Sequence, residues 1–146
     1  MAGIIPVMGE YRYTIDQKHR LFIPAKHREA LGDPLVIFPN FRTPSLRVVS
    51  VEQWEAICEK ISALPAAKRE LMLSFLNSRG DTLSPDSQGR VTLGQGLVDH
   101  AGLTGQVVIV GCGRDAAIWS ADNYRPVSVS DFGNILAEYA DEADVF

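Results

Sequence analysis

The sequence predicts an α+β fold rich in strands, and three observations support this prediction. The segment Asp16–Ile23 recurs seventy positions later as Asp86–Leu93, with an Asp-x-x-x-Arg turn in both copies. The aliphatic runs Leu35–Phe38 and Val107–Val110 follow the two copies in the same order. Apolar residues at helical spacing lie between the copies and after the second. Because whole neighbourhoods recur in order, we expect two copies of one strand–turn–strand–helix–strand unit, with further helices outside them.

The first copy is predicted to begin with a half-buried strand over Glu10–Ile15, where polar and apolar residues alternate. A polar turn, Asp16–Arg20, follows, and a second short strand covers Leu21–Ile23. Pro24 suits the first turn of a helix, where its missing N–H costs nothing. Gly32 suits the end of that helix, where a left-handed residue is often found.

The fourth residue of the turn differs between the copies, being His19 in the first and Gly89 in the second. Glycine at this place indicates a positive φ angle. Histidine is one of the few other residues enriched in that conformation, so we interpret His19 as a turn residue rather than a metal ligand or a catalytic group.

Two helices are predicted between the copies, after a strand over Leu46–Val49. Ser50 and Gln53 have the spacing of a capping box at the start of the first helix. Pro65 opens the second helix, which is expected to run through Asn77. The apolar stripes of these helices suit core packing and a subunit contact equally well, and they comprise Trp54, Ile57, Cys58 and Ile61 in the first helix and Leu71, Met72, Phe75 and Leu76 in the second.

The second copy is less regular than the first. Gly94, Gly96 and Val98 stand where the first copy has Pro24, Lys26 and Arg28, so its helix over Gln95–Ala101 is expected to be short and weak. The sequence therefore divides into residues 1–78 as the first repeat with its helical insert, residues 79–125 as the second repeat, and residues 126–146 as a C-terminal helix with an acidic tail.

Ser130 is the predicted cap of the C-terminal helix. Phe132, Ile135, Leu136 and Tyr139 would share one face of that helix. Asp141, Glu142 and Asp144 make the end of the chain acidic, and we expect it to fray.

Charge is distributed unevenly along the chain. The net charge is −4, yet residues 1–50 hold seven Lys and Arg against four acids, whereas residues 80–146 hold three against ten. Positive charge is therefore a local feature of the first copy, which is more informative about a polyanionic partner than the total.

No catalytic, metal or cofactor site is predicted. The two cysteines, Cys58 and Cys112, are far apart and form no Cys-x-x-Cys pair, which favours a reducing compartment and argues against a disulfide framework or a zinc site. Cys112 between two glycines suits a hairpin turn better than a reactive thiol. No run of residues is long and apolar enough for a membrane span, and no signal peptide is recognisable, so we expect a cytoplasmic protein.

Several motifs together resemble the MraZ family, bacterial regulators of the division and cell-wall gene cluster that are related to AbrB-type DNA-binding domains. The resemblance covers about residues 8–124. The motifs are Gly9-Glu10-Tyr11, Ile15-Asp16-x-Lys18-x-Arg20-Leu21-x-Ile23-Pro24-Ala25-x-x-Arg28, Asp86-x-Gln88-Gly89-Arg90, Ala101-Gly102-Leu103 and Ile118-Trp119-Ser120.

This resemblance implies a β-rich barrel of two intertwined AbrB-like repeats, of the swapped-hairpin or double-split type, with peripheral helices. It also implies a ring of identical subunits that binds tandem promoter repeats in double-stranded DNA as a repressor, in the cytoplasm and nucleoid. It implies no enzymatic activity, small-molecule substrate or cofactor.

The expected DNA contacts are Arg20, Lys18, Arg90, His19, Lys26 and Arg28. Arginine can pair with guanine O6 and N7 or clamp a phosphate, whereas Lys and His provide positive charge to phosphates. Asp16, Asp86 and Gly89 are expected to shape the turns. For Arg20 the alternative is a plain ion pair with Asp16, and for Lys26 and Arg28 it is a solvated helix face.

Two other functions stay open. An AbrB-type antitoxin would use the Phe132–Tyr139 face to bind a toxin and would also bind its own operator. A thiol-dependent enzyme would use Cys112, and this is the weaker alternative because no base is indicated beside it.

Overall fold

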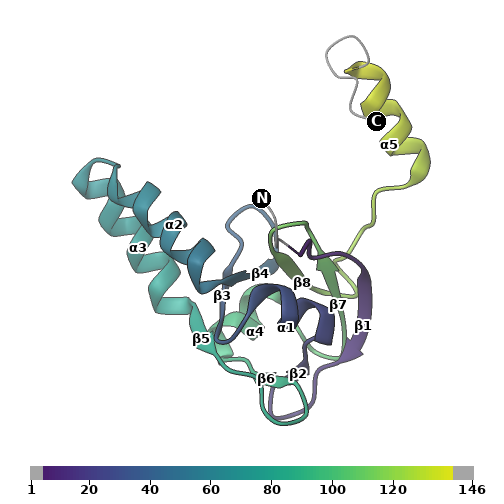
Figure 1. Ribbon diagram of the computed structural model, residues 1–146, viewed down its shortest axis with the longest axis horizontal. Coiled ribbons are helices and arrows are strands. Elements are labelled where there is room, and N and C mark those ends of the chain that lie inside the picture. The colour runs from purple at the N-terminus through teal and green to yellow at the C-terminus, as the bar shows by residue number, and fades with distance from the viewer. Residues whose placement is uncertain (1–4, 140–146) are drawn as a thin grey trace.

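A computed structural model describes residues 5–139 of the chain, which form eight strands and five helices (Figure 1). In chain order the elements are β1 (Glu10–Thr14), β2 (Arg20–Phe22), α1 (Ala25–Leu31), β3 (Leu35–Pro39), β4 (Ser45–Ser50), α2 (Val51–Ser62), α3 (Ala66–Arg79), β5 (Asp81–Leu83), β6 (Arg90–Thr92), α4 (Gln95–Ala101), β7 (Gln106–Gly111), β8 (Ala116–Ser120) and α5 (Val129–Glu138). The predicted α+β class, rich in strands, is confirmed.

Six of these strands form one antiparallel sheet in the order β1-β7-β8-β4-β3-β5, and β2 pairs with β6 in a separate two-stranded ribbon. Strands from the two repeats are interleaved in the large sheet, since β1 of the first repeat pairs with β7 of the second, and β4 of the first pairs with β8 of the second. The order leaves β1 and β5 at the edges, so the closed barrel expected from the resemblance is not found among residues 5–139.

Strand β3 is buried on both faces and separates two hydrophobic clusters. Successive residues of a strand point to opposite faces. Leu35 and Ile37 accordingly lie in the main cluster, which the two repeats share, whereas Val36 and Phe38 lie in a smaller cluster with the helices α2 and α3. This double burial explains the uninterrupted apolar run that marks the strand in the sequence.

Helices α2 and α3 form a hairpin that projects from one side of the molecule (Figure 1). At the start of α2 the Ser50 hydroxyl accepts a hydrogen bond from the backbone N–H of Gln53 at 3.1 Å. The other half of the expected capping box does not form, because Gln53 Oε1 is buried without a hydrogen-bond partner. The predicted apolar face of α3 is only partly used, since Leu76 is buried but Leu71 and Met72 are exposed.

The C-terminal helix α5 begins two residues earlier than predicted. Ser128, not Ser130, is its cap, and the Ser128 hydroxyl accepts from the backbone N–H of Asp131 at 3.0 Å. Both serines have the right chemistry, but Ser130 lies within the first turn of the helix. None of the residues of α5 is buried. The acidic end predicted at Asp141, Glu142 and Asp144 lies outside the described residues.

Candidate nucleic-acid interface

The two Asp-x-x-x-Arg turns have the same hydrogen bonds. Asp16 Oδ1 accepts from the backbone N–H groups of Lys18 at 3.0 Å and Arg20 at 2.8 Å. Asp86 Oδ1 accepts from the equivalent groups of Gln88 and Arg90, both at 2.9 Å. The repeat seen in the sequence therefore extends to individual atoms, and each aspartate closes its turn.

Each aspartate also holds the arginine of its turn by one nitrogen. Arg20 Nε donates to Asp16 Oδ2 at 2.6 Å, and Arg90 Nε donates to Asp86 Oδ2 at 3.0 Å. The Arg20 and Arg90 side chains remain 35% and 30% exposed. Within residues 5–139 their Nη groups have no hydrogen-bond partner. The ion pair thus fixes the guanidinium by Nε and leaves the planar fork of Nη donors available to a ligand.

The fourth residue of each turn adopts the positive φ angle that the sequence predicts, +61° at His19 and +84° at Gly89. Glycine at position 89 has a second cause, because an added Cβ would lie 2.9 Å from the Arg28 guanidinium and 2.9 Å from the Phe22 ring. The residue equivalent to Arg28 in the second repeat is the shorter Val98. The two differences between the repeats therefore compensate each other. Where the side chain is the long Arg28, the turn residue that it faces is a glycine. Where the turn residue is a histidine, the side chain equivalent to Arg28 is the shorter valine.

Pairing of β2 with β6 brings the two turns to the same end of the molecule. The ribbon is antiparallel, with Leu21 opposite Val91 at its centre, and both of these side chains are buried. Two further backbone hydrogen bonds, from Ile23 N to Gly89 O and from Leu93 N to His19 O, are each 2.9 Å long. Ile23 corresponds to Leu93 in the other repeat, and Gly89 corresponds to His19, so exchanging the repeats turns each bond into the other. The two arginine-bearing turns are therefore related by approximate twofold symmetry.

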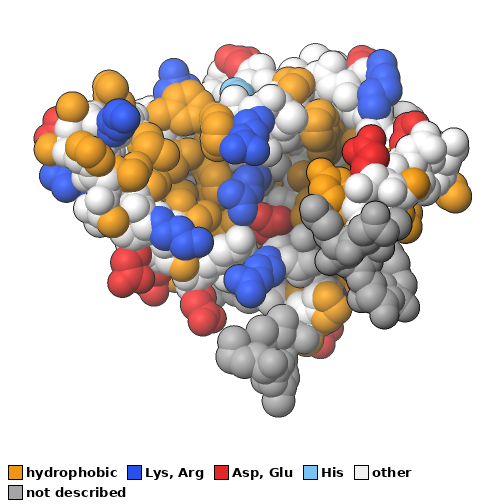
Figure 2. All heavy atoms as spheres, turned by 90° about the horizontal axis from the view of Figure 1, so that it is seen from above, with side chains coloured by type: hydrophobic (Ala, Val, Ile, Leu, Met, Phe, Trp, Pro, Cys, Tyr) orange, Lys and Arg blue, Asp and Glu red, His pale blue; other side chains and the backbone are white. Residues whose placement is uncertain are grey.

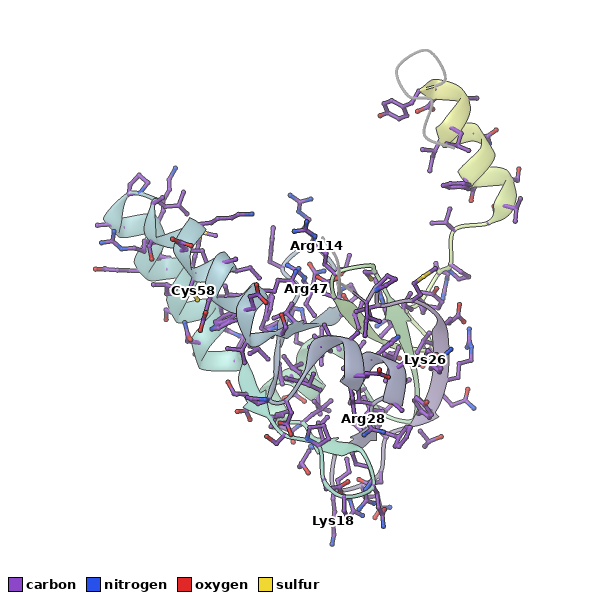
Figure 3. All side chains as sticks on the ribbon, in the orientation of Figure 1. Lys18, Lys26, Arg28, Arg47, Cys58 and Arg114 are labelled. Atoms are coloured by element: carbon purple, nitrogen blue, oxygen red, sulfur yellow. The ribbon has the colours of Figure 1, made fainter. Side chains whose placement is uncertain are left out.

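Three of the remaining cationic candidates lie at or next to these turns, and one does not. Figure 3 shows Lys18 at the lowest point of the view, Arg28 above it and Lys26 higher still, along α1. Arg28 Nε donates to the Ile23 carbonyl at 2.9 Å, and its guanidinium lies 5.6 Å from the centre of the Phe22 ring. The structure thus places Lys18, His19 and Arg28 with the two turns and leaves the exposed Lys26 apart.

The role of Phe22 has no clear signal in the sequence. Its ring packs edge-on against the Tyr13 ring, with 5.1 Å between the centroids. The Arg28 guanidinium lies over the same Phe22 ring. The only hint is its position between the buried Leu21 and Ile23, which directs its side chain to the opposite face of the strand.

The turn aspartates are held in the charged form. Hydrogen bonds lower the pKa of Asp16, first from the backbone N–H of Arg20 and then from its side chain. The pKa of Asp86 is lowered in the same way, first by the backbone N–H of Arg90. Because each carboxylate balances its arginine, the excess positive charge at this end comes from Lys18 and Arg28.

The other reactive side chains have structural surroundings. Cys112 lies in the hairpin between β7 and β8, as predicted, and partial burial together with the Asp115 carboxylate raises the pKa of its thiol. His27 is buried with Nε2 at 2.8 Å from the Met8 carbonyl oxygen, and His100 Nε2 lies 2.7 Å from that of Asn40.

Across residues 5–139 no three His, Cys, Asp or Glu side chains gather to hold a metal ion. In the same range, no helix has the length and apolar character that crossing a membrane requires.

Comparison with known proteins identifies the family of the chain. A family model described as "MraZ protein, putative antitoxin-like" matches residues 7–74 and 78–135, so the similarity continues past residue 124, where the motifs in the sequence end. Proteins named "Transcriptional regulator MraZ" from Leuconostoc mesenteroides and Natranaerobius thermophilus are each 36% identical over 139 residues, which cover 92% of this chain and 96% of theirs. A protein of the same name from Heliobacterium modesticaldum is 38% identical over 120 residues, 80% of this chain and 82% of its own. The chain therefore belongs to the MraZ family.

Proposed function

We propose that this protein is a transcriptional regulator that binds double-stranded DNA sequence-specifically through its two Asp-x-x-x-Arg turns. The observation that carries the proposal is the pair of arginines at the two ends of the short β2–β6 ribbon, each fixed by Nε with its Nη groups unpaired among the described residues. The names of the relatives support the same function.

The turns suit DNA by their chemistry. The Nη fork of Arg20 or Arg90 can donate two hydrogen bonds to guanine O6 and N7 in the major groove, or clamp a phosphate. Lys18, His19 and Arg28 add contacts to phosphates beside each reading group. Lys26 lies farther from the turns and is proposed as an outlying phosphate contact.

A single chain offers few cations for strong binding, so we propose a homo-oligomeric ring that presents many copies of the paired turns. Head-to-tail contacts that close on themselves generate such a ring. Tandem promoter repeats then engage several subunits at high effective concentration. In this proposal the protein is a non-enzymatic, nucleoid-associated repressor of the division and cell-wall gene cluster. Its two AbrB-like repeats, residues 1–78 and 79–125, interlock at the ribbon, and residues 126–146 stand outside them.

A salt-titrated gel shift on the DNA upstream of the gene for this protein tests the proposal. Arg20→Ala should abolish specific binding while the oligomer persists. Arg12→Ala is the matched control, because Arg12 is an exposed arginine that also pairs with an acid, Glu10 at 3.0 Å, but lies on β1 outside the turns. Affinity should fall steeply as salt rises. Unchanged binding by Arg20→Ala would remove this arginine from the interface.

An antitoxin is the second candidate, because the family description includes that word and α5 exposes apolar side chains. Co-purification of a small toxin that depends on α5 would favour it over a regulator that acts alone.

A further inference from the structure

An apolar groove lies between the α2–α3 hairpin and the loop that joins β3 to β4. Its volume is about 710 Å³, and its floor includes Phe38, Ile61 and Leu76. Two side chains at its edge, Phe41 and Leu71, are each 74% exposed. Figure 2 shows hydrophobic side chains gathered on this face beside a row of Lys and Arg side chains. A contiguous exposed apolar surface of this kind marks an interaction site.

The charged side chains that line the groove are all basic, namely Arg42, Arg47 and Lys60. Arg47 is paired with Asp115, whereas Arg42 lies over the Phe41 ring at 5.2 Å. Neither Arg42 nor Lys60 forms an ion pair within residues 5–139. The groove is therefore suited to a helix that has an apolar face and acidic flanks.

Helix α5 has this character. Val129 is 91% exposed, and Ile135 and Tyr139, four residues apart and so on one face, are each about half exposed. The charged residues of α5 are both acidic, Asp131 and Glu138. Over residues 126–146 the sequence holds five acids and no Lys or Arg.

We propose that α5 of one copy docks in the α2–α3 groove of a second copy. Figure 1 shows α5 clear of the body and on the opposite side of the molecule from the α2–α3 hairpin, so α5 does not occupy the groove of its own chain. The contact joins two different surfaces, so it propagates from copy to copy and forms a ring where the rotation closes. The inference rests on the proposed homo-oligomer and names the surfaces that build it.

Disulfide cross-linking between copies tests the docking. In a Cys58→Ser and Cys112→Ser background, Leu71→Cys is introduced into one tagged chain and Ile135→Cys into another of different mass. Mixing the two should give a cross-linked heterodimer on mild oxidation. Lys68→Cys replaces Leu71→Cys in the control, because Lys68 is an exposed residue of the same helix that does not line the groove. An equal yield from this control, or no cross-link at all, would overturn the proposal.

The same two cysteines placed in one chain distinguish the source of α5. A cross-linked dimer or a larger ladder is expected, whereas a cross-link confined to the single chain would show that α5 folds onto its own groove and would overturn the inference. Arg20→Ala should leave the cross-link unchanged. Loss of DNA binding with the cross-link intact would therefore contradict the proposed function but not the docking.

Charge reversal gives an independent measurement. Asp131→Lys with Glu138→Lys should reduce the sedimenting species to the 16.0 kDa monomer, and adding Arg42→Glu with Lys60→Glu should restore the oligomer. All four side chains are exposed, so circular dichroism should show an unchanged fold. An oligomer that resists the first pair of changes, or no recovery with the second pair in folded protein, would refute the pairing.

Discussion

Gly89→Ala is expected to destabilise the protein by about 3 kcal/mol, through two separable effects. The first is conformational, because φ at this residue is +84°, and an L side chain in the left-handed region costs roughly 1–2 kcal/mol. The second is steric, because the new Cβ would meet the Arg28 guanidinium at 2.9 Å. Moving Arg28 breaks its hydrogen bond to the Ile23 carbonyl, and a hydrogen bond from a charged donor contributes about 1.5–3 kcal/mol.

Gly113→Ala provides the matched control for the conformational effect. Gly113 has a φ of +91°, yet nothing lies within 4 Å of a Cβ built there, so only the roughly 1–2 kcal/mol of the conformation should be lost. Urea unfolding at one fixed protein concentration measures both variants, because the stability of an oligomer depends on concentration. In an Arg28→Ala background, the additional cost of Gly89→Ala should become smaller without vanishing, because the Phe22 ring would still lie 2.9 Å from the new Cβ. Equal losses for Gly89→Ala and Gly113→Ala would refute the contact between the Arg28 guanidinium and the second turn.

Three further predictions follow from the turns and from α2. Arg20→Lys keeps the charge but loses the fork, so its affinity for the specific site should fall by about 1–3 kcal/mol in a gel shift, with less effect on non-specific DNA. Because the folded protein lowers the pKa values of Asp16 and Asp86, the stability that these carboxylates contribute is present above their unfolded-state pKa and is lost as pH falls through the folded-state pKa. Changing both residues to Asn should therefore flatten the acid side of a plot of urea midpoint against pH. A plot that is the same as for the unchanged protein would contradict this. Ser50→Ala should cost about 1 kcal/mol, whereas Gln53→Leu should cost nothing or stabilise, because Gln53 Oε1 is buried without a partner; thermal melts that reverse this order would contradict both assignments.

The local features of the turns could be predicted from the sequence because their causes are local. Each aspartate accepts hydrogen bonds from N–H groups of its own turn, and the residue with positive φ lies in the same turn. Both features therefore depend only on residues within four positions of each other. Both copies accordingly have the expected geometry, with His19 at +61°. The strand β3 could also be located, because burial on both faces requires an unbroken apolar run.

The arrangement of the turns could not be predicted from spacing alone. Leu21 pairs with Val91, seventy positions away. No local sequence pattern indicates with which other strand a three-residue strand will pair. The contact of Arg28 with Gly89 depends on that pairing. Arg28 alone suggested a solvated helix face or a phosphate contact, and Gly89 alone suggested a turn residue with a positive φ angle. At α5 two serines of equal chemistry compete for the cap, and the sequence does not distinguish Ser128 from Ser130.

The unequal tips of the ribbon give each molecule a polarity. One tip carries Lys18 and His19 before its arginine, and the other carries Gln88 and Gly89, although both belong to a single chain. If the two tips came from two identical chains, they could not differ, because any substitution would alter both tips together. A duplex held across this end is therefore met by different chemistry on its two sides, so we expect the preferred DNA element to be directional, with a distinguishable head and tail, rather than a palindrome.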